Sequence, residues 1–388
     1  MNKKQREIIN NYLTNKEAEA LKFLEELVKI DSYSYDKNGV SNVSNHIKNK
    51  LEAEGIECIL KENTDYGPHL TARVKGDKRG KILMVGHQDT AHKTDTLEHF
   101  NFLKDGEILR GPGVSDMKAG LVYMVYLLMA FNDTQPDDRY DLEILFTPDE
   151  EIGSPISKDI IAETSRDALA VFVLEPARPD GSIVISRKGS AHLKINIKGK
   201  AAHSGAFIED GISANDELAQ KMIAIKKLSD TQKDLTLNFG LIEGGVSNNI
   251  VSPHASATIH LAFWNIQDYE DVYKEIEAIV NHAYIKGTES ELSGNLGMLP
   301  MENNEQNMEL YEQIVLKAAA DLNQKIIGLP TKGASEAGFT SAEGVPTICG
   351  MGPVGGNWHT LEEYLDLNSF LPRLKLFGTS ILYSMKHF

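Results

Sequence analysis

The sequence has very little cysteine, no long apolar segment and a shortage of positive charge. Only Cys58 and Cys349 occur among 388 residues, too few for a disulfide framework. We therefore expect two free thiols and a cytoplasmic protein, with a single disulfide as the alternative. The longest apolar stretch, Leu121 to Phe131, is far shorter than the roughly 20 residues that span a bilayer. The formal net charge of −16 argues against nucleic acid and anionic membranes as partners, because long-range repulsion opposes both.

What the sequence does contain is typical of a soluble globular protein of two domains. Hydrophobic residues make up 41% and charged residues 25%, and 388 residues exceed one ordinary core. Residues 1–23 carry positive charges without the apolar region of a signal peptide, and they indicate an amphipathic helix.

Hydrophobic periodicity predicts an α/β fold for most of the chain. Apolar residues at three- and four-residue spacing predict helices at 16–30 and 40–54, and the apolar run 121–131 is too long for a strand and predicts a third helix. Short apolar runs predict strands at 69–75, 81–86, 142–147 and 170–174. Continuous apolar strands separated by helices predict a mixed sheet covered by helices on both faces.

The pattern changes near residue 186 to alternating apolar and polar residues, which predicts a sheet with one solvated face. A strand–helix–strand–strand–helix order follows, and 287–306 is expected to be a polar connector. We therefore predict an inserted α+β sandwich at 188–301, with 1–187 and 302–388 forming the larger domain. A helix at 308–323, a strand at 345–350 and a helix at 367–383 would complete that domain.

Acidic and histidine residues stand where the apolar strands end. His87 and Asp89 follow one strand, Glu150 and Glu151 follow another, and Glu175 follows a third. In an open α/β sheet, functional groups gather outside the carboxyl ends of the strands. Neutral imidazole and carboxylates suit zinc, and a carboxylate beside such ligands can act as general base. Each residue alone also fits a blander role, such as a solvated loop or a helix N-terminus.

Asp116 and His359 extend this set. Asp116 lies in a glycine-rich loop before the buried helix, where it would serve as an N-cap or as a carboxylate bridging two cations. His359 stands beside a tryptophan near the C-terminus, and a lone histidine there is more often packed or exposed than a ligand.

Motifs spanning nearly the whole chain resemble the di-zinc hydrolase family of glutamate carboxypeptidases, acetylornithine deacetylases, succinyl-diaminopimelate desuccinylases and aminoacylases. They occur in family order as GHQDT, GPGVSDMKAG, TPDEEIGS, LEP, GKAAHSG, GGVSNNI and NWHTLEEYL. The LEP and GKAAHSG segments are most similar to the glutamate carboxypeptidase branch. The resemblance implies a zinc-exopeptidase-like catalytic domain and an inserted lid and dimerisation domain.

The resemblance also implies roles for individual residues. Asp116 would bridge two Zn²⁺ ions per subunit, and a cis peptide would follow it; Co²⁺ or Mn²⁺ would also suit these ligands. His87 and Glu175 would complete one metal's ligands, and Glu151 and His359 the other's. Glu150 would be the general base, and Asp89 would orient His87.

Two further residues are implied to contact substrate. His203 would polarise the scissile carbonyl, reaching the partner's active site in a homodimer built through the inserted domain, and Asn248 would bind substrate. The family's carboxylate-binding arginine is replaced here, with Phe263 at the aligned position, so Arg187, Lys188 or Lys332 would have to substitute. The loop 333–336 also departs from the family pattern.

Three hypotheses follow. The first is a metal-dependent carboxypeptidase-type exopeptidase that cleaves a peptide or N-acyl amide through a hydroxide bridging the metals. The second is an N-acyl-amino-acid deacylase or desuccinylase, favoured by the departure at Phe263. The third, from another class, is a metal-binding homologue without catalysis.

Overall fold

The computed structural model describes residues 3–388 and divides into two compact units. The large unit comprises Met1–Ser186, Asn303–Thr331 and Ser335–Phe388, and the small unit comprises Arg187–Glu302 and Lys332–Ala334. The boundaries expected after residue 187 and before residue 302 lie one residue from these.

The assignment of 332–334 to the larger domain differs from the structure. Arg187 Nη1 donates to the carbonyls of Gly333 at 3.0 Å and Ala334 at 3.1 Å. Lys332 Nζ lies 2.9 Å from Asp234 Oδ2. These contacts join the three residues to the small unit, and so short a segment has no periodicity that could have predicted them.

The large unit is built on a mixed eight-stranded sheet, which confirms the predicted fold class. Its central strands β6, β3 and β7 are mutually parallel, and β2 pairs antiparallel with β6. In spatial order the strands are β1 (Cys58–Lys61), β2 (His69–Val74), β6 (Asp141–Thr147), β3 (Lys81–His87), β7 (Ala168–Val173), β14 (Thr347–Cys349), β8 (Ile183–Arg187) and β13 (Gly328–Thr331).

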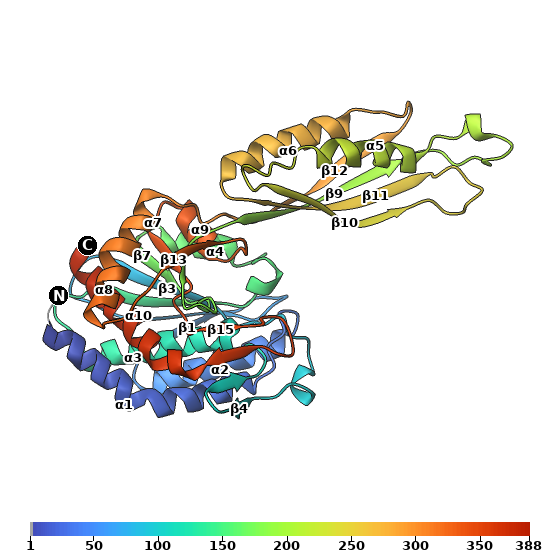
Figure 1. The fold of residues 1–388 in the computed structure, drawn as a ribbon. Helices are drawn as coiled ribbons and strands as arrows, with labels where there is room; N and C mark the ends of the chain where they lie inside the picture. Colours follow the sequence, from blue (N-terminus) through green and yellow to red (C-terminus); the bar gives the residue numbers. More distant parts are fainter. Residues whose placement is uncertain (1–2) are drawn as a thin grey trace. The chain divides into compact units, whose positions relative to one another are not determined.

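Helices cover both faces of this sheet (Figure 1). α1 (Lys3–Val28) contacts α3 (Ala119–Thr134) and α10 (Leu367–His387), and α2 (Lys37–Ala53) contacts α3; on the other face α4 (Lys158–Ser165) contacts α9 (Ala337–Ala342). A second sheet has the order β15 (Gly355–Gly356), β16 (Tyr364–Asp366), β5 (Ile108–Arg110), β4 (Leu103–Asp105). The helix predicted at 308–323 consists of α7 (Glu305–Glu309), η5 (Leu310–Val315) and α8 (Leu316–Asp321).

Helix α3 is the centre of the core. Every residue from Ala119 to Phe131 is buried, as expected for a helix that is apolar on all sides. The segment Val114–Thr134 is long and apolar enough to cross a membrane, but 94% of its apolar window is buried inside the protein. We interpret it as a core helix. Cys58 and Cys349 are both buried, and no disulfide joins them.

The small unit is a four-stranded antiparallel sheet with two helices on one face (Figure 1). Its elements are β9 (Gly189–Lys198), α5 (Ala214–Lys226), β10 (Thr236–Gly244), β11 (His254–Phe263), α6 (Ile266–Asn281) and β12 (Glu289–Met298), with spatial order β10-β11-β9-β12. Alternate residues of β9 are buried, as its alternating sequence predicted.

Strand β12 corrects the expectation of a polar connector at 287–306. It pairs with β9 along its whole length and forms one edge of the sheet. Only Leu292 and Leu296 pack against the core of this unit. An edge strand needs only one half-buried face. Its apolar residues were therefore too few to predict a strand from the sequence.

Candidate metal centre

The parallel strands β6, β3 and β7 bring three of the predicted site segments together. His87 ends β3 and stands opposite Thr147, the last residue of β6, so Glu150 and Glu151 follow at the same edge. Val85 is paired with Val173 of β7, which places Glu175 near the level of His87. The pairing of these strands therefore brings the predicted residues to one edge of the sheet, as their positions after the strand ends predicted.

Asp116 reaches the same edge from η2 (Val114–Lys118), which leads into α3. This segment packs closely on β3: a Cβ at Gly86 would lie 2.5 Å from Met117 Cε and 2.6 Å from Met124 Cε. Glycine at this position lets both methionine side chains lie against β3 without being displaced. The peptide bond Asp116–Met117 is cis, at the predicted position.

His359 arrives on the loop between β15 and β16. Its Nε2 lies 3.0 Å from Glu151 Oε2 and 3.4 Å from Asp116 Oδ2. The side chain is 57% exposed, whereas His87 is 1% exposed. The cluster therefore has one deeply buried end and one end open to solvent.

The predicted site residues lie in two overlapping groups that share His87. His87 Nε2 lies 3.5 Å from Asp116 Oδ1 and 3.8 Å from Glu175 Oε1. Ligand atoms of His87, Asp116 and Glu151 lie within 4.8 Å of one another, and so do those of His87, Glu150 and Glu175. The group of His87, Glu150 and Glu175 places Glu150 within the cluster as well.

The chemistry of this cluster fits divalent cations. His87 Nε2 is buried and has no hydrogen-bond partner among residues 3–388, although it points toward carboxylates. Imidazole nitrogen and carboxylate oxygen are both zinc ligands. A buried nitrogen without a partner, beside two carboxylates, is what a metal position requires.

Asp89 supports the site through more contacts than the sequence indicated. His87 Nδ1 lies 2.9 Å from the Asp89 carbonyl oxygen and 3.4 Å from its carboxylate. That carboxylate accepts hydrogen bonds from Ser34 Oγ at 2.6 Å and from the backbone N–H groups of Glu150 and Glu151. Asp89 thus fixes both the imidazole and the two glutamates, which leaves His87 Nε2 free to face the cluster.

The carboxylates and imidazoles shift one another's pKa values. Burial, opposed by His87 and reinforced by Glu175 and Glu151, raises the pKa of Glu150 well above its usual value. Burial tends to raise the pKa of Asp116, but the nearby His359 and His87 imidazoles hold it far below its usual range. Bonds to Asp116 and Glu151 raise the pKa of His359 to about 11. The site thus strongly attracts positive charge.

The structure places His203 and Asn248 on exposed loops of the small unit, where neighbouring segments pair through His203 and Ile250. His203 Nδ1 accepts hydrogen bonds from the N–H groups of Gly205 and Ala206, both at 3.2 Å. This network assigns the ring proton to Nε2, so the exposed nitrogen is a hydrogen-bond donor.

Sequence reasoning missed Glu363 and Ser34. Glu363 is fully buried and accepts hydrogen bonds from the Asp116 loop. It was visible inside the NWHTLEEYL motif, but nothing in the pattern separated it from its exposed neighbour Glu362. Ser34 carries no signal of its own.

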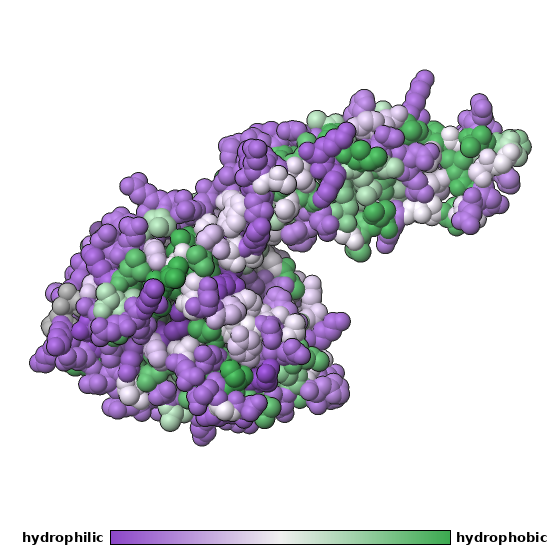
Figure 2. Space-filling view, viewed as in Figure 1, coloured by the Kyte–Doolittle hydropathy of each residue, from purple (hydrophilic) through white to green (hydrophobic). Residues whose placement is uncertain are grey.

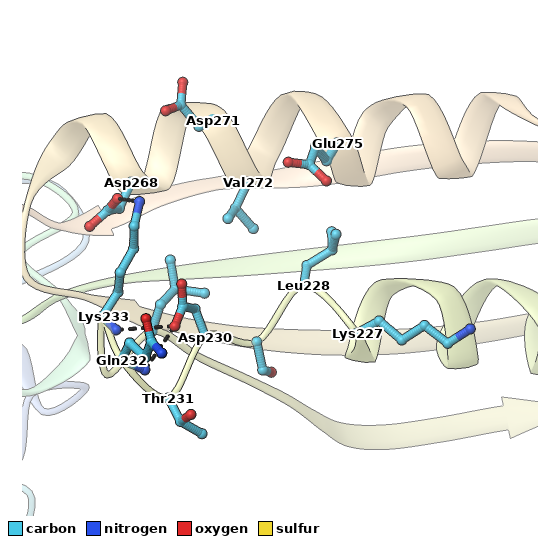
Figure 3. Close-up of a pocket in the computed structure, with 12 residues that line it drawn as sticks. Lys227, Leu228, Asp230, Thr231, Gln232, Lys233, Asp268, Asp271, Val272 and Glu275 are labelled. Atoms are coloured by element: carbon cyan, nitrogen blue, oxygen red, sulfur yellow. Dashed lines mark hydrogen bonds and ion pairs between the residues drawn. The ribbon is translucent and has the colours of Figure 1, made fainter.

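A separate pocket of about 630 Å³ lies in the small unit, between the loop after α5 and α6 (Figure 3). Asp230, Gln232 and Lys233 line it from the loop, and Asp268 lies opposite with its carboxylate paired to Lys233. Its lining residues include no histidine or cysteine, and its acids are partly neutralised. It is therefore not a second candidate for the metal centre.

An α/β sheet with histidine and carboxylates converging at its strand ends defines a metal-dependent hydrolase. Residues 83–383 match the family model described as peptidase family M20/M25/M40, and the chain belongs to this family. It is therefore a metallopeptidase or a related hydrolase.

Several relatives are distant in sequence but match along most of their length. The chain is 24% identical to carboxypeptidase G2 of Pseudomonas sp. (strain RS-16), over 95% of this chain and 90% of the relative. It is 23% identical to succinyl-diaminopimelate desuccinylase of Delftia acidovorans, over 91% and 94%. A Bacillus subtilis structure described as a dinuclear metal binding peptidase superposes with a TM-score of 0.71 at 16% identity, over 97% of this chain and 99% of that one.

Proposed function

We propose that this protein is a carboxypeptidase-type exopeptidase that uses two zinc ions to hydrolyse a peptide or N-acyl amide bond. The observation that carries the proposal is the shared position of Asp116, whose two carboxylate oxygens face His87 on one side and His359 on the other. His87 and Glu175 would hold one ion, Glu151 and His359 the other, and Asp116 both. Similarity to carboxypeptidase G2 supports the reaction type.

Bound metals would acidify water and polarise the scissile carbonyl. Glu150 would accept a proton from the attacking water and pass it to the leaving amine. In the metal-free chain, burial and the neighbouring carboxylates raise the pKa of Glu150 above its usual value. Asp89 holds the Glu150 backbone N–H at 3.2 Å, so the base does not depend on a mobile loop.

His203 would donate its Nε2–H to the carbonyl oxygen as negative charge develops there. The bonds at Nδ1 support this role, because they fix the neutral tautomer with a donor at the exposed nitrogen. Asn248 would contact the substrate from the neighbouring loop.

Recognition of a substrate carboxylate has weak support, and this favours the deacylase as a second candidate. Phe263 is fully buried in the core of the small unit, against Tyr269 and Gly189. Of the three proposed substitutes, Arg187 bonds to backbone carbonyls. Lys188 is 3% exposed and paired with Asp234. Lys332 is 72% exposed but also pairs with Asp234. Two such lysines lack the fork geometry of arginine.

A homodimer through the small unit is part of the proposal. β10 is an edge strand with Leu241 and Ile242 exposed, and α5, which contacts β10, exposes Ile223. Figure 2 shows hydrophobic surface along this unit. An apolar sheet edge of this kind favours pairing with another chain.

The proposal is tested with purified protein loaded with Zn²⁺ and a panel of amides. Peptides with varied C-terminal residues should be cleaved from the C-terminus, and N-acetyl and N-succinyl amino acids should react more slowly. Faster hydrolysis of the N-acyl amino acids would favour the deacylase. A protein that binds metal but cleaves neither set would be a binding homologue.

A further inference from the structure

Glu363 is a buried carboxylate with hydrogen bonds to both oxygens, placed four residues after His359. We propose that Glu363 is a positioning residue that holds the Asp116 loop, so that Asp116 presents one oxygen to each metal. This inference rests on the proposed dinuclear function. Glu363 itself faces backbone N–H groups, Ser115 Oγ and His92, and it is not one of the proposed ligands.

One oxygen of Glu363 binds the loop immediately before and at Asp116. Oε1 accepts hydrogen bonds from Ser115 N at 2.9 Å, from Ser115 Oγ at 3.2 Å and from Asp116 N at 3.0 Å. The last bond acts on the backbone of Asp116 itself. The rotation of this backbone determines where the Asp116 carboxylate points.

The other oxygen binds two further segments. Oε2 accepts a hydrogen bond from Gly113 N and lies 2.9 Å from His92 Nε2. Gly113 has a positive φ of 71°, at the turn that begins η2. His92 lies three residues after Asp89 and is 7% exposed. One side chain therefore joins the loops that carry Asp89, Asp116 and His359.

These contacts suit a carboxylate at this position, because every partner in the Asp116 loop is a hydrogen-bond donor. Backbone N–H groups of Gly113, Ser115 and Asp116 converge on one carboxylate, which is the arrangement of a backbone anion-binding nest. Hydrogen bonds to an ionised acceptor are stronger and shorter than neutral ones. A side chain 0% exposed with every one of these bonds made has little freedom to move.

Glu363→Gln tests the proposal because it keeps the shape and removes the charge. If the amide NH₂ replaces Oε2, it faces the N–H of Gly113; if it replaces Oε1, it faces the N–H groups of Ser115 and Asp116. Either orientation sets donor against donor, so the loop must shift. Partners that orient metal ligands typically contribute about 10–100-fold in affinity. We expect a loss of that order for Zn²⁺ and Co²⁺ in chelator competition, together with a changed Co²⁺ absorption spectrum.

Glu362→Gln is the matched control, since Glu362 is the exposed neighbour and should keep wild-type affinity and spectrum. Melting of the metal-free variants checks that each is folded. If Glu363→Gln does not fold, Ser115→Ala removes only one donor to Oε1 and should weaken metal binding less, in the same direction.

The outcomes separate the two claims. A wild-type chain that binds two metals, with folded Glu363→Gln or Ser115→Ala indistinguishable from it in affinity and spectrum, would overturn the positioning role alone. A wild-type chain that fails to bind two metals would overturn the proposed function and this inference with it.

Discussion

At the scale of single residues, the proposed metal ligands and the proposed general base differ in their contacts. Asp116 faces both histidines through different oxygens, whereas Glu150 lies near His87 and Glu175 without an ion pair to either histidine among the described residues. The two roles predict opposite results on substitution.

Glu150→Gln should retain both metals and lose about 10²–10⁴-fold in kcat, because an amide cannot accept the proton of the attacking water. Metal content and steady-state hydrolysis of the best substrate are the measurements. Glu163→Gln, at an exposed site on α4, should behave as wild type. Near-normal turnover by the Glu150 variant would remove it from the proton-transfer role.

Asp116→Asn should lose metal, because an amide does not supply two anionic oxygens. We expect fewer than two ions per chain by elemental analysis, with activity lost in parallel. Asp105→Asn, at an exposed position of β4, should keep two. Full occupancy in the Asp116 variant would show that the carboxylate does not bridge.

At the scale of elements, the small unit is stabilised by an ion pair buried among its helices. Lys221 Nζ lies 2.7 Å from Glu217 Oε1 on α5, and neither side chain is exposed. Lys221 also donates to the carbonyls of Ile279, Val280 and His282 at the end of α6. Glu217 accepts hydrogen bonds from the backbone N–H groups of Tyr284 and Ile285, which follow α6. The ion pair therefore connects α5 to the end of α6.

Lys221→Met should lower the free energy of unfolding of the small unit by about 3–5 kcal/mol, since Glu217 is left charged and buried. Urea unfolding is the measurement. Lys227→Met at the exposed end of α5 is the control, and adding Glu217→Gln should recover part of the loss. Because all five proposed ligands lie in the large unit, metal content should not change. An unchanged unfolding midpoint would show that the pair contributes nothing.

Elements also show what the sequence could predict. The strand ends at His87, Glu150 and Glu175 were predictable because buried parallel strands read as continuous apolar runs and end together. Strand β12 was not predictable from the sequence, because an edge strand buries few side chains. Glu363 was not, because its role depends on backbone N–H groups about 250 residues away, and backbone donors leave no trace in sequence.

At the scale of the whole molecule, the proposed metal ligands belong to one unit, and the substrate-contacting candidates His203 and Asn248 belong to the other. Activity would therefore require both units. If His203 acts on a partner's site, it would also require two chains.

Leu241→Lys should convert the proposed dimer to a monomer and reduce activity while leaving metal content intact, because it places charge on the exposed apolar edge of β10. Sedimentation velocity and kinetics would be measured together. Ile59→Lys is the control, at a residue 62% exposed in the large unit. A verified monomer with full activity would contradict action of His203 across the dimer.

The central claim is that two metals share Asp116 while Glu150 remains unligated. Anomalous diffraction from crystals grown with Zn²⁺ tests it most directly. The account predicts two peaks, one at ligand distance from His87, Asp116 and Glu175 and the other from Asp116, Glu151 and His359. A single peak, or a peak coordinated by Glu150 together with His87 and Glu175, would contradict it.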